Sequence, residues 1–76
     1  MKNNNIKNNL RKYRVWKTLT QEQLAMELGV SLAQIRLIEN KHHYPRYQTR
    51  SKICVFFNIN QNQMFYKVGA NDEVNI

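Results

Sequence analysis

The stretch TQEQLAMELGVSLAQIRLIEN, residues 20 to 40, indicates the architecture of the chain because it contains two helix starts separated by one glycine. Thr20, with Gln23 three residues later, has the pattern of a capping box at the start of a helix. Ser31 repeats the arrangement, again with a glutamine three residues later. Gly29 suits the left-handed conformation that ends many helices. The stretch therefore predicts two short helices joined by a sharp corner.

The residues on both sides of this stretch extend the helical pattern. Three more helices are predicted from apolar residues at helical spacing: about 5–16 with Ile6, Leu10 and Tyr13, roughly 47–57 with Ile53, Cys54 and Phe57, and a short last helix with Ile59, Met64 and Phe65. Asn40 and KHHYPR at 41–46 predict an irregular connection, because Pro45 disfavours helical conformation in the residue before it. Asn58 is a predicted left-handed stop.

Length and composition limit the chain to one small helical domain. Its 76 residues are 42% hydrophobic, and two glycines with one proline are too few turn formers for a sandwich of short strands. We therefore predict an all-α, compact five-helix domain over 1–76, with a core of about 5–66. Residues 67–76 are predicted to form a tail or a dimerisation arm.

Positive charge flanks the central stretch. The formal net charge is +7, and no acidic residue stands among the cations that precede residue 20, which are Lys2, Lys7, Arg11, Lys12, Arg14 and Lys17. More cations follow from Lys41 onward, whereas 20–40 is slightly acidic. Clustered cations favour a polyanion partner over a purely solvated surface.

Other functional classes have little support in the sequence. Cys54, the single cysteine, lies in the apolar run KICVFF and is predicted to be a buried thiol. His42 and His43 lack a third ligand at metal-site spacing, so we predict surface or phosphate-contacting histidines, with no metal and no cofactor. The chain has no glycine-rich phosphate loop or catalytic set, which argues against an enzyme. Without a signal peptide or an apolar run of about 18 residues, we expect a cytoplasmic protein with no membrane partner.

The corner at Gly29 makes the two central helices a helix-turn-helix, whose second helix can lie in the major groove of DNA. At about 100° per residue, Ile35 and Ile38 set the buried side of that helix. The outward side then carries Ala33, Arg36 and Leu37, with Leu32 at its edge. Phosphate contacts are expected where the two helices start and in the loop after them, at Gln21, Ser31, Lys41 and Arg46.

Several motifs point together to one known family. They are LTQEQLAMELGVS at 19–31, IEN at 38–40, Pro45 and INQNQMF at 59–65. With these motifs, residues 6 to 65 resemble the Cro/repressor-type helix-turn-helix family, also called XRE or lambda-repressor-like. The resemblance implies five helices around one core and binding to double-stranded DNA. It also implies a structural pair of Arg14 with Glu39 that braces the first helix against the third.

The resemblance further implies DNA contacts at particular positions. Gln21 matches a glutamine that contacts the DNA backbone and can reach a base, and the recognition positions hold Ser31, Leu32, Ala33, Gln34 and Leu37. The family usually has glycine where Thr18 and Lys41 stand, so both loops must turn without it. Three recognition positions are apolar and cannot make bidentate hydrogen bonds to bases. Specificity is therefore expected from Gln21, Gln34 and Arg36, or from DNA shape.

Two hypotheses about function follow from these observations. The first is a sequence-specific transcriptional regulator, a small Cro-like repressor that binds a palindromic operator as a homodimer. The second is a protein-interaction module, an antitoxin or a heterodimerising anti-repressor, with an apolar face that includes Trp16, Leu32 and Leu37. Trp16 is alternatively a core residue. The dimer surface is expected either at the last helix, with Phe65 and Tyr66, or in the tail from Val68 to Ile76.

Overall fold

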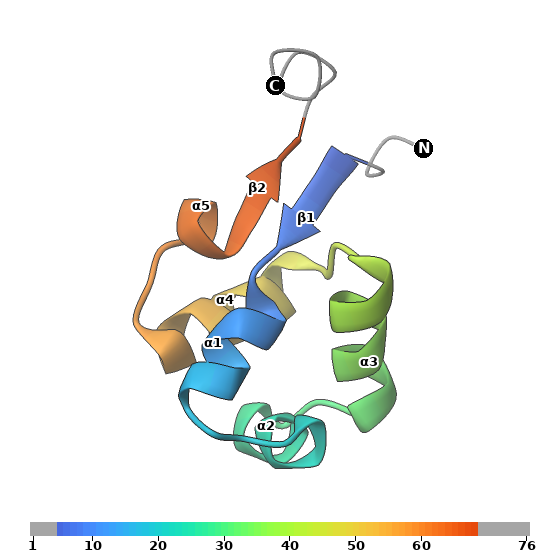
Figure 1. Ribbon diagram of the computed structural model, residues 1–76, viewed down its shortest axis with the longest axis vertical. Coiled ribbons are helices and arrows are strands. Elements are labelled where there is room, and N and C mark those ends of the chain that lie inside the picture. Colours follow the sequence, from blue (N-terminus) through green and yellow to red (C-terminus); the bar gives the residue numbers. More distant parts are fainter. Residues whose placement is uncertain (1–4, 69–76) are drawn as a thin grey trace.

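The computed structural model describes residues 5–68, which form five helices and two short strands (Figure 1). In chain order these are β1 (Ile6–Asn8), α1 (Leu10–Trp16), α2 (Gln21–Leu28), α3 (Leu32–Lys41), α4 (Tyr47–Phe57), α5 (Gln61–Met64) and β2 (Phe65–Lys67). The helices α1 to α4 form the body, and the two strands form a ribbon at one end (Figure 1). The prediction of a predominantly helical domain with five helices is confirmed.

The prediction of a strictly all-α chain is wrong, because the two ends of the described segment pair with each other. β1 and β2 are antiparallel, with Ile6 opposite Lys67 and Asn8 opposite Phe65. The first helix therefore does not include residues 5–9, and Phe65 and Tyr66 lie on a strand and not in the last helix. Lys67, predicted in the tail, belongs to the ribbon.

Asn8 explains why the first helix starts later than its apolar spacing predicts. Its Oδ1 accepts a hydrogen bond from the Leu10 N–H (3.0 Å), and its Nδ2 donates to the Ile38 carbonyl (2.9 Å). Such side-chain bonds to the backbone compete with helix formation. In the sequence, the spacing of Ile6 and Leu10 predicts a helix that includes both residues, and the hydrogen bonds of Asn8 cannot be seen.

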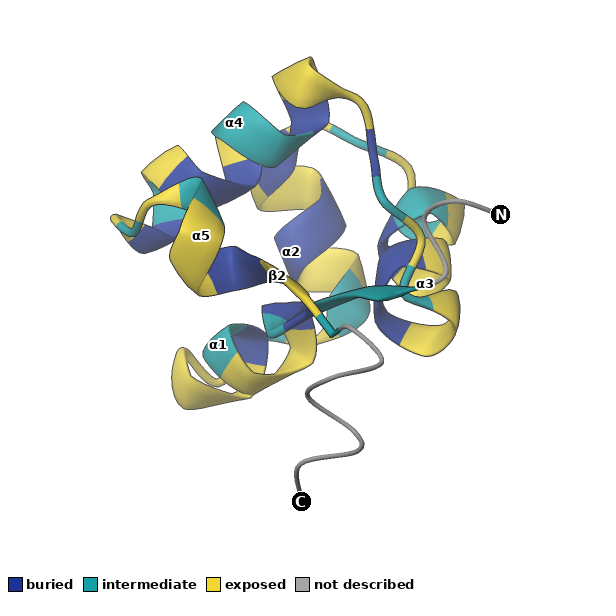
Figure 2. Cartoon of the chain, turned by 90° about the horizontal axis from the view of Figure 1, so that it is seen from above, coloured by how far each residue is buried: buried dark blue, intermediate teal, exposed yellow. Residues whose placement is uncertain are grey.

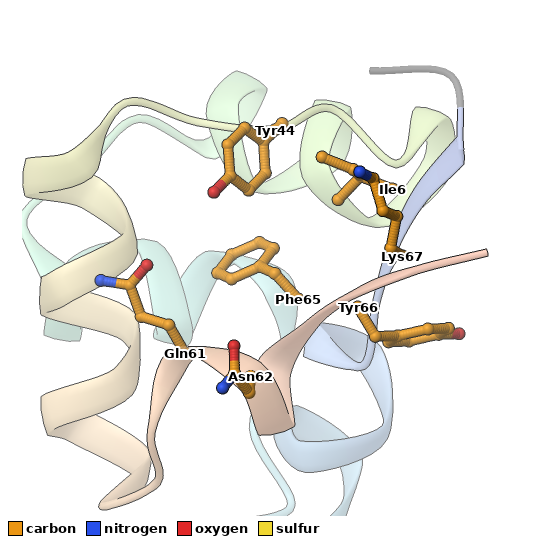
Figure 3. Close-up of a pocket in the computed structure, with 7 residues that line it drawn as sticks. All are labelled: Ile6, Tyr44, Gln61, Asn62, Phe65, Tyr66 and Lys67. Atoms are coloured by element: carbon orange, nitrogen blue, oxygen red, sulfur yellow. The ribbon is translucent and has the colours of Figure 1, made fainter. Parts of the chain in front are cut away.

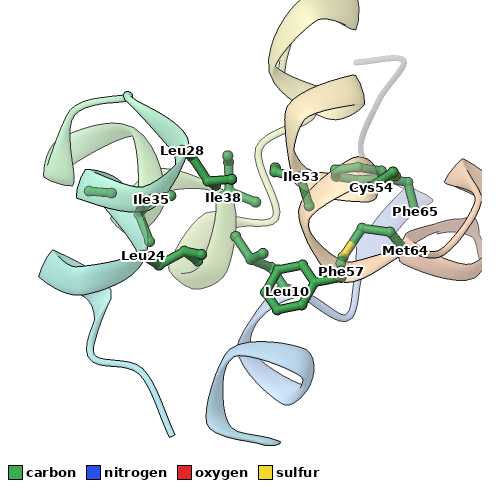
Figure 4. Close-up of a cluster of buried hydrophobic side chains, with 11 residues drawn as sticks. Leu10, Leu24, Leu28, Ile35, Ile38, Ile53, Cys54, Phe57, Met64 and Phe65 are labelled. Atoms are coloured by element: carbon green, nitrogen blue, oxygen red, sulfur yellow. The ribbon is translucent and has the colours of Figure 1, made fainter. Parts of the chain in front are cut away.

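One core fills the space between the helices (Figure 4). Its buried apolar residues are Leu10, Leu24, Ala25, Leu28, Ile35, Ile38, Ile53, Cys54, Phe57, Met64 and Phe65. Cys54 is a free, buried thiol, as predicted. Burial raises the pKa of this thiol, and the charge of Arg50 opposes the change only in part. The thiol therefore stays protonated and unreactive at neutral pH.

The predicted corner between the central helices is confirmed. Thr20 Oγ1 accepts from the Gln23 N–H (3.0 Å), and Gln23 Oε1 accepts from the Thr20 N–H (2.8 Å). Gly29 ends α2 in the left-handed conformation with φ 70°. Ser31 Oγ then accepts from the Gln34 N–H (3.1 Å) at the start of α3. The end of α2 and the start of α3 are thus both capped by local contacts.

The loops that lack glycine also use left-handed residues. In the first of the two loops, Thr18 is left-handed with φ 56°. In the second, the left-handed residue is His42 (φ 51°) and not Lys41. Asn40 and Lys41, predicted in the irregular connection, instead continue α3. The helix can extend this far because Pro45 restricts only the residue directly before it. Asn58 has φ 58° after α4, as predicted.

Replacing Thr18 with glycine is expected to raise the free energy of unfolding by about 0.5–1 kcal/mol, because glycine adopts positive φ without strain at Cβ. The matched variant Lys41→Gly should lower it by roughly 0.5–1 kcal/mol, since Lys41 has helical backbone. Urea denaturation of both variants measures the two changes. Changes of the same sign would contradict this placement of the left-handed residue.

Candidate nucleic-acid interface

The outward side of α3 is accessible along the helix. Ile35 and Ile38 are fully buried and anchor α3 on the core. Figure 2 shows the buried side of α3 turned toward the other helices and an exposed side facing away from them. Of the predicted recognition residues, Ser31, Ala33, Arg36 and Leu37 are exposed, and Leu32 and Gln34 are partly exposed. The structure thus leaves all six available at this surface.

This side of α3 carries positive charge without an exposed carboxylate. Arg36 and Lys41 are exposed cations of the helix, and Glu39 is its one acidic residue. The Glu39 side chain is completely buried in an ion pair with Arg14. A phosphate that approaches α3 therefore meets two cations and no accessible carboxylate of this helix.

Glu39 lies at the centre of a hydrogen-bonded network that joins three helices. Its Oε2 accepts from Arg14 Nε (2.6 Å), and its Oε1 accepts from Arg14 Nη2 (3.1 Å). Oε1 also accepts from Gln21 Nε2 at 3.0 Å. Arg14 Nη1 donates to the Leu19 carbonyl (2.7 Å). These charge-assisted bonds satisfy the buried carboxylate and hold α1 and the start of α2 against α3.

The N–H groups at the start of α4 were not predicted as part of the site. Lys41 ends α3 and Arg46 is the N-cap of α4, and both are exposed. Arg46 makes no side-chain cap hydrogen bond within residues 5–68, so the first N–H groups of α4 remain open to an acceptor. Tyr47, the next residue, is 64% exposed. The helix predicted from about residue 47 could have indicated this third helix start.

Arg50 holds the loop between α3 and α4 in place. Its guanidinium lies 4.4 Å from the centre of the Tyr44 ring and 5.5 Å from that of Tyr47. It also donates to the Pro45 carbonyl (2.7 Å) and to Gln61 Oε1 (3.0 Å). The loop that carries Arg46 is therefore fixed to α4 and α5 rather than loosely attached.

Trp16 is not a core residue, because 67% of it is exposed, as is 56% of Val15. The Lys12 ammonium lies 5.4 Å from the centre of the Trp16 ring. These residues belong to the lining of a shallow cavity of about 510 Å³, which Leu32 and Leu37 do not line. The structure therefore does not bring the three residues of the predicted apolar face into one cavity.

Among residues 5–68, no group of three His, Cys, Asp or Glu side chains could hold a metal ion. His42 Nδ1 lies 3.4 Å from the Asn8 backbone nitrogen, which gives this histidine a structural contact. A cavity of about 390 Å³ lies beside β2, and the rings of Phe65 and Tyr44 that line it have centres 5.6 Å apart. Figure 3 shows these two rings facing each other. No helix in the described part of the chain is long and apolar enough to cross a membrane.

Comparison with known proteins identifies a helix-turn-helix family. A family described as a helix-turn-helix domain matches residues 7–70, a range that includes all the predicted contact residues. The chain is also 40% identical over 60 residues to an uncharacterized HTH-type transcriptional regulator of Methanocaldococcus jannaschii. That similarity covers 79% of this chain and 91% of the relative.

Proposed function

Because the chain belongs to the helix-turn-helix domain family, we propose that it is a sequence-specific DNA-binding transcriptional regulator. The observation that carries the proposal is the surface of α3, where Arg36 and Lys41 are exposed while Glu39 is buried in its ion pair. A helix with such a surface can enter the major groove between two rows of phosphates. The relative from Methanocaldococcus jannaschii, named as an uncharacterized HTH-type transcriptional regulator, supports the same function.

Each predicted contact residue has a distinct part in this proposal. Ala33, Arg36 and Leu37 face base edges, with Leu32 and Gln34 beside them. Apolar side chains there pack on thymine methyl groups, and the Arg36 guanidinium donates to guanine O6 and N7. Ser31, Lys41, Arg46 and the open N–H groups of α4 bind phosphates. Gln21 reaches the DNA from the start of α2, where it can contact the backbone or a base.

The proposal includes a homodimer, because one recognition helix contacts too few base pairs for tight binding. Two copies would bind half-sites of a palindromic operator about 34 Å apart. Repression by occlusion of a promoter, as in small Cro-like regulators, is the proposed mechanism. Phe65 is buried and unsuited to a dimer surface, whereas 40% of Tyr66 is exposed. The rest of the predicted dimerisation arm, 69–76, lies outside the described residues.

A protein-interaction module is the second candidate function. The observation that favours it is the exposure of Val15 and Trp16 beside Lys12 on α1. Large apolar side chains at a surface are a common feature of protein interfaces. The cavity beside these residues is not lined by Ala33, Arg36 or Leu37. A partner bound there would leave these outward residues of α3 free, so this candidate is compatible with DNA binding.

Selection from a random duplex library, followed by titration at several salt concentrations, tests the proposed function. We expect the selected site to bind about a thousandfold more tightly than random duplex. Lys41→Gln should reduce the slope of log affinity against log salt by about 1 for each copy bound, because one phosphate contact is lost. Lys52→Gln, which removes an exposed cation of α4, should leave the slope unchanged. Equal, weak binding to all duplexes would refute the proposal.

A further inference from the structure

The side-chain amide of Gln21 is oriented by a buried carboxylate. Gln21 is the first residue of α2, and its Nε2 donates to Glu39 Oε1 at 3.0 Å. A carboxylate paired with an arginine only accepts hydrogen bonds, so Gln21 must turn its nitrogen, and not its oxygen, toward Glu39. Glu39 cannot rotate away easily, because Arg14 holds both of its oxygens at 2.6 and 3.1 Å.

This orientation determines which polar atoms Gln21 offers to a ligand. One N–H of the Gln21 side-chain amide is bound to Glu39, so Oε1 and the second N–H remain available to a ligand. In the major groove, a neighbouring acceptor and donor match the N6 amino group and the N7 atom of adenine. A phosphate oxygen can accept only from the second N–H and leaves Oε1 without a donor. The arrangement therefore favours a base, which satisfies both atoms, over the DNA backbone.

We propose that Glu39 is a positioning residue that makes Gln21 read an adenine in the major groove. The inference rests on the proposed function, since it requires α3 to lie in that groove. Glu39 lies near the end of α3 and is 7% exposed, so it acts through Gln21 without touching DNA itself. Gln21 is partly exposed and reaches α3 from the start of α2. The network thus adds a base contact that α3 alone does not supply.

The first measurement needs no DNA. In NMR spectra of the wild-type protein, one Nε2 proton of Gln21 should exchange with water several-fold more slowly than those of Gln48, which is exposed on α4. Equal exchange in the two side chains would overturn the orientation by Glu39. This outcome is independent of whether the protein binds DNA.

The second measurement is selection from a random duplex library with the wild-type protein and two variants. The wild type should enrich adenine at one position of each half-site. Gln21→Met should remove roughly a 10- to 100-fold preference there and leave the other positions unchanged. Glu39→Gln should also lose this preference although Gln21 is present. The amide oxygen should take the place of Oε2, which accepts the shorter bond from Arg14, so that the N–H₂ group takes the place of Oε1 and meets the N–H₂ group of Gln21. Gln48→Met is the matched control and should change no position.

The outcomes separate the two proposals. A wild-type protein that selects no sequence refutes the proposed function, and the adenine contact with it, whereas the exchange measurement still reports the orientation. Uniform loss of affinity in Gln21→Met, without a change at one position, would identify a phosphate contact and overturn the inference. A folded Glu39→Gln protein that keeps the adenine preference would overturn it as well. If thermal unfolding shows that Glu39→Gln does not fold, two other results test the inference. They are the base preference lost in Gln21→Met and the slow proton exchange of Gln21 in the wild type.

Discussion

Replacing Glu39 with alanine should lower the free energy of unfolding by about 3–5 kcal/mol. The Glu39 side chain is fully buried, and the side chain of its partner Arg14 is only 11% exposed. The variant leaves the guanidinium with its charge uncompensated, and Gln21 loses its acceptor. Because small domains have total stabilities of roughly 5–10 kcal/mol, this loss takes the protein close to unfolding at room temperature. Urea denaturation followed by circular dichroism measures it.

The control for this prediction removes both charges together. A double variant with Arg14→Met and Glu39→Leu leaves no buried charge unpaired and should recover most of the lost stability. A loss below about 1 kcal/mol in Glu39→Ala would show that the pair behaves like an exposed surface ion pair.

Truncation of Leu24 is the second change with a large expected effect. Leu24 is fully buried on α2, so Leu24→Ala should lower the free energy of unfolding by about 2–5 kcal/mol through lost burial and the cavity that remains. Met26 lies two residues away on the same helix and is 82% exposed. Met26→Ala should therefore change the stability by less than about 0.5 kcal/mol. Similar losses in the two variants would contradict the orientation of α2.

The central helices were predictable because their signals are local. Thr20, Gln23 and Gly29 define the ends of α2 through contacts within a few residues, and the alternation of buried and exposed residues on α3 follows from helical periodicity. The ribbon was not predictable in this way, because it pairs residues 6–8 with 65–67 and neither segment signals the other. Its three-residue strands are also too short to show a clear alternation.

The candidate site likewise has one part that could be predicted from the sequence and another part that could not. The outward residues of α3, such as Ala33 and Arg36, could be placed from sequence because their direction depends only on the helix that carries them. The bond between Gln21 and Glu39 could not, since it depends on how the start of α2 packs against the end of α3. The open start of α4 was missed because the absence of a cap is visible only when the side chains are placed.

The ribbon also has a consequence for the order of folding. Closing a loop between residues 6 and 67 costs more chain entropy than forming the adjacent helices α2 and α3, whose contacts are short-range. The Asn9 N–H donates to the Met64 carbonyl, so packing of α1 and α5 already brings the ribbon's two strands together. We therefore expect the strands to pair as a late step, with a folding rate that depends on the helices rather than on the ribbon.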